Sequence, residues 1–324
     1  MGRPQIFRNT VLAFLLALPN GALAATVYVS NEKDNTITVL DGQSGELKKT
    51  ISVGQRPRGI VLSADRKALY ICASDDDIIQ VLDLKTAKIT HTLPSGDDPE
   101  TFALHPNGRF LYVSNEDDNL VTVIDVEKRE AVAEIPVGVE PEGIGISPDG
   151  KWAIATSETT NMAHWIDTKT NTLVKNVLVD SRPRYVAFTP KAEEAWVSAE
   201  IGGKVNVIDS ASHEIVRRIG FAIPGIESAR LQPVGIAHMK DGPWSFVALG
   251  PANHVAVIDR KTYAVEKYLL VGSRVWNLAF SPDGKWLYTT NGTSNDVSII
   301  DVEALKVRKS VATGRFPWGI DVGP

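Results

Sequence analysis

Short runs of alternating apolar and polar residues recur along the chain, and most of them end at an aspartate. Clear examples are residues 36–40, 121–124, 205–208, 255–258 and 297–300, all rich in Val, Ile and Thr. A period of two and β-branched side chains predict β-strands. No segment has a sustained helical period, which disfavours folds in which helices alternate with strands.

The aspartates that end these runs are regularly spaced. They are Asp41, Asp83, Asp125, Asp167, Asp209, Asp259 and Asp301. Successive spacings are 42 residues, except for 50 between Asp209 and Asp259. A period in the low forties that holds four strand-like runs is typical of a propeller blade. We therefore predict an all-β fold, a seven-bladed β-propeller of four-stranded antiparallel blades.

One unit can be divided into its four strands. We expect strand A at 143–147, strand B at 152–156, strand C at 162–166 and strand D at 172–178. The Pro-Asp-Gly-Lys sequence at 148–151 predicts a tight turn between A and B. The chain after residue 24 starts with a B strand (25–30) and ends with an A strand (317–322). The two ends together make one blade, so we predict that the C-terminal strand joins the N-terminal three and closes the ring.

The first 24 residues form a separate unit. Arg3 and Arg8 precede an apolar run at 11–18, and Ala22-Leu23-Ala24 has the small-x-small form of a signal-peptidase site. This pattern predicts a signal peptide cleaved after Ala24, because the apolar run is shorter than the roughly 20 residues that cross a bilayer. We therefore expect a leader at 1–24, a single propeller domain at 25–324, periplasmic or secreted localisation, and no membrane span after cleavage.

Composition excludes several classes of protein. Of 324 residues, 43% are hydrophobic and 23% charged, a balance that excludes wholesale disorder. The formal charge of −5 becomes −7 without Arg3 and Arg8, which argues against a nucleic-acid binder. The single Cys72 excludes a disulfide framework and a cysteine-based metal site.

The repeat also resembles a known family. The Tyr-Val-Ser-Asn runs at 28–31 and 112–115, with the segments 136–144 and 147–151, resemble the YVTN repeat of bacterial and archaeal seven-bladed β-propellers. The leader, the seven-unit length and the segment 223–226 resemble, more narrowly, the propellers associated with pyrroloquinoline quinone (PQQ)-dependent catabolism. That resemblance implies an exported protein that works beside quinoprotein alcohol dehydrogenases, and it does not imply that this chain binds the quinone.

Charged residues gather at the D–A connections. In a four-stranded blade these connections lie on the same face as the B–C loops, at the rim of the central channel. Counting from the repeat places the following side chains at this rim as candidate ligand-binding residues: Arg58, Glu100, Glu142, Arg182, Arg184, Arg274, Trp276 and Trp318. One hypothesis is a polar funnel in which the arginines clamp carboxylates and the tryptophans stack on a ligand. The alternative is that these side chains pair with one another and stabilise the ring without a ligand.

The break in the period adds eight residues within 220–230. They lengthen a D–A connection, so we expect them on the face that carries the rim. Two interpretations of these residues stay open: a functional lid or docking loop, and a tolerated insertion. On either hypothesis we expect deletion of residues 221–228 to leave folding intact.

Signals for catalysis and metal binding are weak. The six histidines lack metal-ligand spacing, and the acidic runs 75–77 and 116–118 lack the alternating ligands of a calcium loop. We therefore predict no catalytic residues, no metal and no cofactor. The leading hypothesis is a non-catalytic, monomeric binding or scaffold protein for a small molecule or a periplasmic quinoprotein partner. The alternatives are a lactonase-type hydrolase that uses Glu100, Glu142 and the arginines of the funnel, and a self-associating surface protein.

Overall fold

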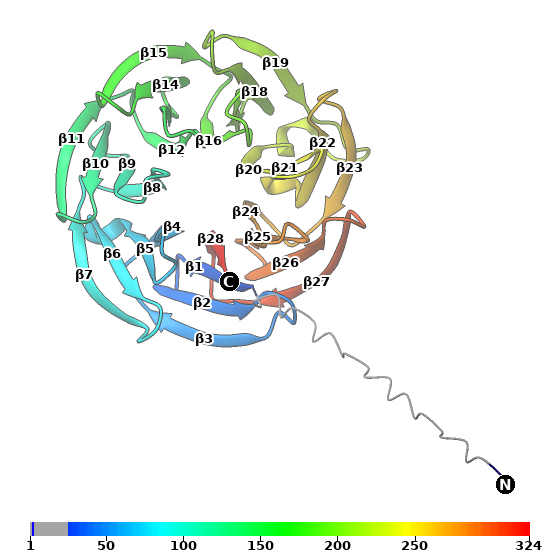
Figure 1. The fold of residues 1–324 in the computed structure, drawn as a ribbon. Helices are drawn as coiled ribbons and strands as arrows, with labels where there is room; N and C mark the ends of the chain where they lie inside the picture. The colour runs from blue at the N-terminus through cyan, green and yellow to red at the C-terminus, as the bar shows by residue number, and fades with distance from the viewer. Residues whose placement is uncertain (1, 3–24) are drawn as a thin grey trace.

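The computed structural model describes Gly2 and residues 25–324, and the predicted leader at 1–24 otherwise lies outside the described residues. Residues 25–324 form seven four-stranded antiparallel sheets arranged in a ring (Figure 1). The innermost strands of the blades are β4, β8, β12, β16, β20, β24 and β28. The prediction of an all-β, seven-bladed propeller is confirmed.

The strands have the following bounds. Blade 1 contains β28 (Pro317–Gly323), β1 (Thr26–Asn31), β2 (Thr36–Asp41) and β3 (Leu47–Ser52). Blade 2 contains β4 (Pro57–Leu62), β5 (Ala68–Ala73), β6 (Ile78–Asp83) and β7 (Lys88–Pro94). Blade 3 contains β8 (Pro99–Leu104), β9 (Phe110–Asn115), β10 (Leu120–Asp125) and β11 (Glu130–Pro136). Blade 4 contains β12 (Pro141–Ile146), β13 (Trp152–Ser157), β14 (Met162–Asp167) and β15 (Thr172–Leu178).

The other three blades follow the same order. Blade 5 contains β16 (Pro183–Phe188), β17 (Glu194–Ala199), β18 (Lys204–Asp209) and β19 (Ile215–Gly220). Blade 6 contains β20 (Pro233–His238), β21 (Trp244–Leu249), β22 (His254–Asp259) and β23 (Val265–Leu270). Blade 7 contains β24 (Val275–Phe280), β25 (Trp286–Asn291), β26 (Asp296–Asp301) and β27 (Lys306–Ala312). Three short 3₁₀ helices are η1 (Ser74–Asp76), η2 (Ser228–Arg230) and η3 (Gly250–Ala252). Among the described residues, none lies in a helix of the length and apolar character that a bilayer span requires.

The ring is closed by the two ends of the described chain. Strand β28 lies beside β1 (Figure 1) and pairs with it antiparallel. Val29 is opposite Ile320 in this pairing. This pairing confirms the predicted closure and gives the edge of β1 a partner. Strand A of the fourth blade begins at Pro141 rather than at residue 143. Proline is tolerated there because it lies on the inner edge strand of its blade, where its missing N–H breaks no bond to a neighbouring strand.

The recurring aspartate organises each C–D turn. At all seven positions its Oδ1 accepts a hydrogen bond from the backbone N–H two or three residues further on; Asp41, for example, accepts from Ser44 at 2.8 Å. Such Asx turns reverse the chain after a strand. The aspartate that marks the period in the sequence is therefore a turn residue.

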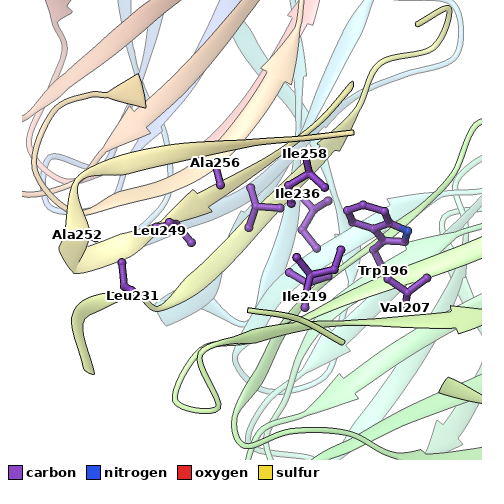
Figure 2. Close-up of a cluster of buried hydrophobic side chains, with 11 residues drawn as sticks. Trp196, Val207, Ile219, Leu231, Ile236, Leu249, Ala252, Ala256 and Ile258 are labelled. Carbon is purple, nitrogen blue, oxygen red and sulfur yellow. The ribbon is translucent and has the colours of Figure 1, made fainter. Parts of the chain in front are cut away.

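Hydrophobic clusters lie between neighbouring blades. The cluster between blades 5 and 6 joins Trp196, Val207 and Ile219 to Ile236 and Ile258 (Figure 2). The clusters are separate, and each joins two adjacent sheets around the ring. Each sheet therefore packs against both of its neighbours, and the hydrophobic core is a ring of inter-blade contacts around the channel.

A second repeated contact fixes the D–A connections. Asn119, at the end of one B–C loop, accepts a hydrogen bond from the N–H of Glu140 at 3.0 Å, and both residues have positive φ angles of 57° and 58°. Equivalent clamps are made by Asn35, Asp77, Asn161, Asn253 and Asn295. Gly203 occupies this position in blade 5, and the connection that follows carries the eight extra residues.

The extra segment is packed against the ring. Phe221, Ile223 and Ile226 are partly buried against the cluster between blades 5 and 6. The hydroxyl of Tyr268 accepts from the N–H of Ala222 at 2.9 Å. These contacts anchor the segment, and its deletion would expose part of a hydrophobic cluster, so we expect the deletion to lower stability. That folding stays intact after the deletion remains a prediction.

Candidate functional site

The predicted rim residues lie on one face, close to a set of glutamates in the B–C loops. In each blade the N–H of the first B–C loop residue donates to the carbonyl of the residue just before strand A, for example Glu158 to Glu140 at 2.9 Å. Arg58, Glu100, Glu142, Arg184, Trp276 and Trp318 are each the second residue of an inner strand. Arg182 and Arg274 directly precede inner strands. The repeat therefore brings all eight predicted residues to the same mouth of the channel.

Glu142 and Glu100 form the centre of an ion-pair network. Glu142 Oε2 lies 2.7 Å from Arg184 Nη1, and Glu142 Oε1 lies 3.2 Å from Arg58 Nη2. Glu100 lies 2.5 Å from Arg58 Nη2 and also pairs with Arg56. Arg56 additionally pairs with Asp98 at 2.8 Å. The network thus joins blades 2, 3, 4 and 5 across the channel mouth.

The second half of the network uses glutamates from the B–C loops. Glu158 pairs with Arg184 and lies 2.8 Å from Arg182 Nε. Glu200 lies 2.7 Å from Arg274 Nη2 and 3.5 Å from Nε of both Arg182 and Arg184. Glu100, Glu142, Glu158 and Glu200 are between 1% and 7% exposed. Carboxylates as buried as these need cationic partners, and each has at least two.

The two tryptophans are covered by arginines of the same network. The guanidinium of Arg58 lies 4.4 Å from the Trp318 ring centroid. That of Arg274 lies 4.2 Å from the Trp276 ring, and Arg184 approaches the same ring at 5.7 Å. These are cation–π distances. One face of each indole is therefore occupied by a side chain of the protein.

This geometry favours the second of our two hypotheses for the rim. The five arginines already have carboxylate partners, so an incoming carboxylate would have to displace one. The rim and the first B–C loop positions carry more acidic than basic groups. Eight carboxylates, of Glu32, Asp98, Glu100, Glu116, Glu140, Glu142, Glu158 and Glu200, face five guanidinium groups. Binding of an anion at this face is disfavoured, and ligand binding by the eight residues stays a prediction.

Two carboxyl groups at the edge of the network hold protons more tightly than usual. Burial, with the nearby charge of Glu100, raises the pKa of Glu116 to about 7 and that of Asp98 to about 6. Burial also acts to raise the pKa of Glu100, but Arg58 and Arg56 outweigh it and leave that pKa below its ordinary value. Carboxylate oxygens of Asp98, Glu100 and Glu116 lie within 4.8 Å of one another, the arrangement that a hard cation could use. Arg56 already pairs with two of the three.

An open cavity of about 460 Å³ adjoins the network over blades 3 to 5. Its charged lining consists of Glu116, Glu140, Glu158 and Arg182. Thr159 donates to Glu140 in its wall. The cavity is therefore mainly acidic and has one partly exposed arginine.

Our sequence reasoning considered the run 116–118 only as a calcium loop and missed the glutamates of the B–C loops as partners of the rim arginines. Glu32, Glu116, Glu158 and Glu200 stand at multiples of the 42-residue period and follow directly on strands β1, β9, β13 and β17. This recurrence in the sequence could have identified them as partners of the rim arginines. They supply the counter-charges that decide whether the rim arginines are free.

Comparisons with known proteins agree with the fold. A family model described as the cytochrome D1 heme domain matches residues 64–182, and a model of the WD domain G-beta repeat matches residues 266–301. No curated protein matches the chain. Each of the two models covers a part of the ring.

Three solved structures share the architecture. Hydrazine synthase of Kuenenia stuttgartiensis is 22% identical, with a TM-score of 0.78 over 86% of this chain and 92% of that chain. A "putative 6-phosphogluconolactonase" of Bacteroides fragilis is 18% identical, with a TM-score of 0.77 over 93% and 98%. The dihydro-heme d1 dehydrogenase NirN is 14% identical, with a TM-score of 0.69 over 91% and 74%. At these identities the likeness defines the class of fold, a seven-bladed β-propeller, and leaves the activity open.

Proposed function

We propose that this chain is an exported, non-catalytic β-propeller that binds a protein partner in a periplasmic PQQ-dependent alcohol oxidation system. The resemblance of the repeat and the leader-like N-terminus supply the pathway and the compartment. The observation that supports a binding role is the charge of this face: Glu100, Glu142, Arg58 and Arg184 neutralise one another and form a fixed base. The rim and first B–C loop positions as a whole carry eight carboxylates against five guanidinium groups, an acidic excess. Rigid surfaces of one charge sign suit electrostatic association with a partner of opposite sign.

The acidic character extends outward from the network in blades 2 and 3. The charges of Asp118, Asp77 and Asp117 are close enough to Asp97 to raise its pKa. Asp117 is exposed in the B–C loop of blade 3, and no ion pair engages it within residues 25–324. We therefore propose that the partner, a quinoprotein dehydrogenase or its redox partner, presents a basic surface here.

The proposal is tested by measuring the binding of purified quinoprotein alcohol dehydrogenase from the same organism to this protein by calorimetry. Asp117→Lys should weaken binding, and added salt should weaken it in the wild type. The matched control is Glu127→Lys, a charge reversal in the C–D turn on the other face, where the side chain is 71% exposed. Equal effects of the two substitutions, or no binding, would contradict the proposal.

Export is tested separately. Mass spectrometry of the protein isolated from the periplasm should give an N-terminus at Ala25. An intact N-terminus on protein retained in the cytoplasm would contradict the export proposal.

A second candidate function, a lactonase-type hydrolase, is supported by one observation. Glu116 lines the open cavity, and its pKa of about 7 suits a group that exchanges protons near neutral pH. Glu100 and Glu142 are less suited because arginines cover both. A lactone-hydrolysis assay decides this point: activity that disappears in Glu116→Gln would support the hydrolase, and equal rates would exclude Glu116 as its base.

A further inference from the structure

A basic groove lies on the face opposite the network, between the A–B turn of blade 5 and the A–B and C–D turns of blade 6. It has a volume of about 380 Å³, and Lys191, Lys240, Arg260 and Lys261 line it. Within residues 25–324, none of these four cations has a carboxylate oxygen within 4.0 Å. This distinguishes the groove from the other face, where all five rim arginines are paired.

Hydrogen bonds to the protein fix the side chains at the base of the groove. Arg260 donates to the carbonyl of Met239 at 2.6 Å and also to that of Gly242. Of the two carboxylates in the lining, Glu194 accepts from Trp196 Nε1 at 2.9 Å and from the hydroxyl of Tyr263. Trp196 belongs to the inter-blade cluster shown in Figure 2. Four cations thus face two carboxylates on a packed base, and the groove keeps a positive surplus.

A larger apolar cavity of about 600 Å³ opens beside this groove, at the end of the central channel. Equivalent residues of the inner strands line it, all of them apolar: Ile60, Phe102, Ile144, Val186, Leu278 and Ile320. All but Ile320 are at most 9% exposed, because they also pack into the inter-blade clusters. The two cavities share the lining residues Pro190 and Lys240, so they are neighbours. We refer to the apolar cavity as the lower funnel.

The polar groups of the lower funnel are few. The carboxylate of Asp321 is used by the ring, since it accepts from the N–H groups of Leu62 and Val322 at 2.7 Å each. Tyr185 also lines the funnel, and burial raises its pKa to about 12, so its hydroxyl keeps its proton and can donate. His238 is engaged by the hydroxyl of Ser245 at 2.7 Å. The side chains that line the lower funnel are therefore mainly apolar, and polar atoms share nearly half of its surface.

We infer that the lower funnel and the basic groove together bind a single-chain anionic amphiphile, a long-chain carboxylate, with its chain in the funnel and its carboxylate at the groove. Apolar surface in the funnel favours burial of the chain. Cations without carboxylate partners favour an anion at its end. A combined volume of several hundred Å³ is in the range of small-molecule sites. Lys240, which lines both cavities, is the residue that joins the two halves of the site.

The experiment is a calorimetric titration of the full chain with dodecanoate, below its micelle concentration. We expect saturable binding, and we expect acetate and dodecanol to bind at least about tenfold more weakly, because each lacks one half of the ligand. Lys240→Glu should weaken dodecanoate binding about tenfold or more. Ala103→Phe, which adds bulk inside the funnel wall, should weaken dodecanoate and dodecanol alike.

The matched control is Lys85→Glu, which occupies in the C–D turn of blade 2 the position that Lys261 occupies in blade 6. Lys85→Glu should leave binding unchanged. Thermal melting of each variant separates lost binding from lost folding, and Lys240→Glu should melt like the wild type because Lys240 is exposed. Equal losses in Lys85→Glu and Lys240→Glu, equal affinity for dodecanol and dodecanoate, or binding to phosphatidylglycerol vesicles alone would overturn the inference.

Discussion

Arg58 and Glu142 belong to blades that are two positions apart, and yet Arg58 Nη2 lies 3.2 Å from Glu142 Oε1. Arg184 reaches the same carboxylate from the following blade at 2.7 Å. A single buried carboxylate therefore connects three blades across the channel mouth. The network stabilises the ring in a place where sheet hydrogen bonds cannot, because the inner strands of different blades do not pair with one another.

Removing the charge of Glu100 should destabilise the ring. In Glu100→Gln, Arg56 and Arg58 lose their shared counter-charge in a buried place, and we expect the free energy of unfolding to fall by about 3 kcal/mol. Urea denaturation measures this change. Glu127→Gln, at an exposed pair 3.7 Å long, should cost less than about 0.5 kcal/mol. Equal midpoints for the two variants would show that the network contributes nothing to stability.

The asparagine clamps should each contribute measurably. Asn119→Gly removes the acceptor for the N–H of Glu140 and keeps a residue suited to a φ of 57°, so we expect a loss of about 1 kcal/mol. Asn119→Ala should lose more, because alanine is strained at positive φ. Asn119→Asp keeps the acceptor, as Asp77 does in blade 2, and should lose least. Thermal melting that ranks the three variants in another order would contradict this explanation.

Stability should fall as the pH rises through the range in which Glu116 ionises. Its pKa is about 7 in the folded protein against an ordinary 4.5, so between these values the folded state keeps a proton that the unfolded state has released. The unfolding free energy therefore decreases with rising pH, by about 1 kcal/mol for this partly exposed group.

The comparison of wild type with Glu116→Gln isolates this effect, because Asp98 and the buried His238 act in both proteins. We expect the variant to gain stability relative to wild type as the pH rises from 5 to 8, measured by urea denaturation. A constant difference between the two proteins over that range would mean that the pKa of Glu116 is not raised.

The inserted segment should contribute to stability. Deletion of residues 221–228 removes Phe221, Ile223 and Ile226 from the cluster between blades 5 and 6, and we expect a loss of roughly 2 kcal/mol or more. Replacement of Glu227, which is exposed in the same segment, by Ala should have no measurable effect. A deletion variant that melts at the wild-type temperature would restore the idea of a tolerated insertion.

The sequence predicted the architecture well because the period is carried by a turn residue with a local role. Asp125 accepts hydrogen bonds from the backbone N–H groups two and three residues further on. Because this contact lies within a single turn, the aspartate recurs at the same position in every blade. Ring closure followed from the two partial blades. Placement of the rim residues followed from the same period, and all eight lie together on one face.

The pairing of the rim could not be read from the period alone. Whether Arg184 has a carboxylate partner depends on the position of the Glu158 and Glu200 side chains, which lie in B–C loops and not in the D–A connections. Their side chains meet only because the carbonyl before strand A holds the first residue of the B–C loop. The packing of Phe221 likewise depends on a neighbouring blade and has no local sequence signal.

The pairing of β28 with β1 also constrains the order in which the molecule can be completed. Blade 1 holds only three of its strands until residues 317–323 are synthesised, so the edge of β1 stays unpaired until then. Another copy of the chain can donate its own final strand to that edge in the meantime. At high concentrations of nascent chain, β1 can therefore pair with β28 of its own chain or with β28 of another copy. Rapid pairing with its own β28 favours the monomeric ring.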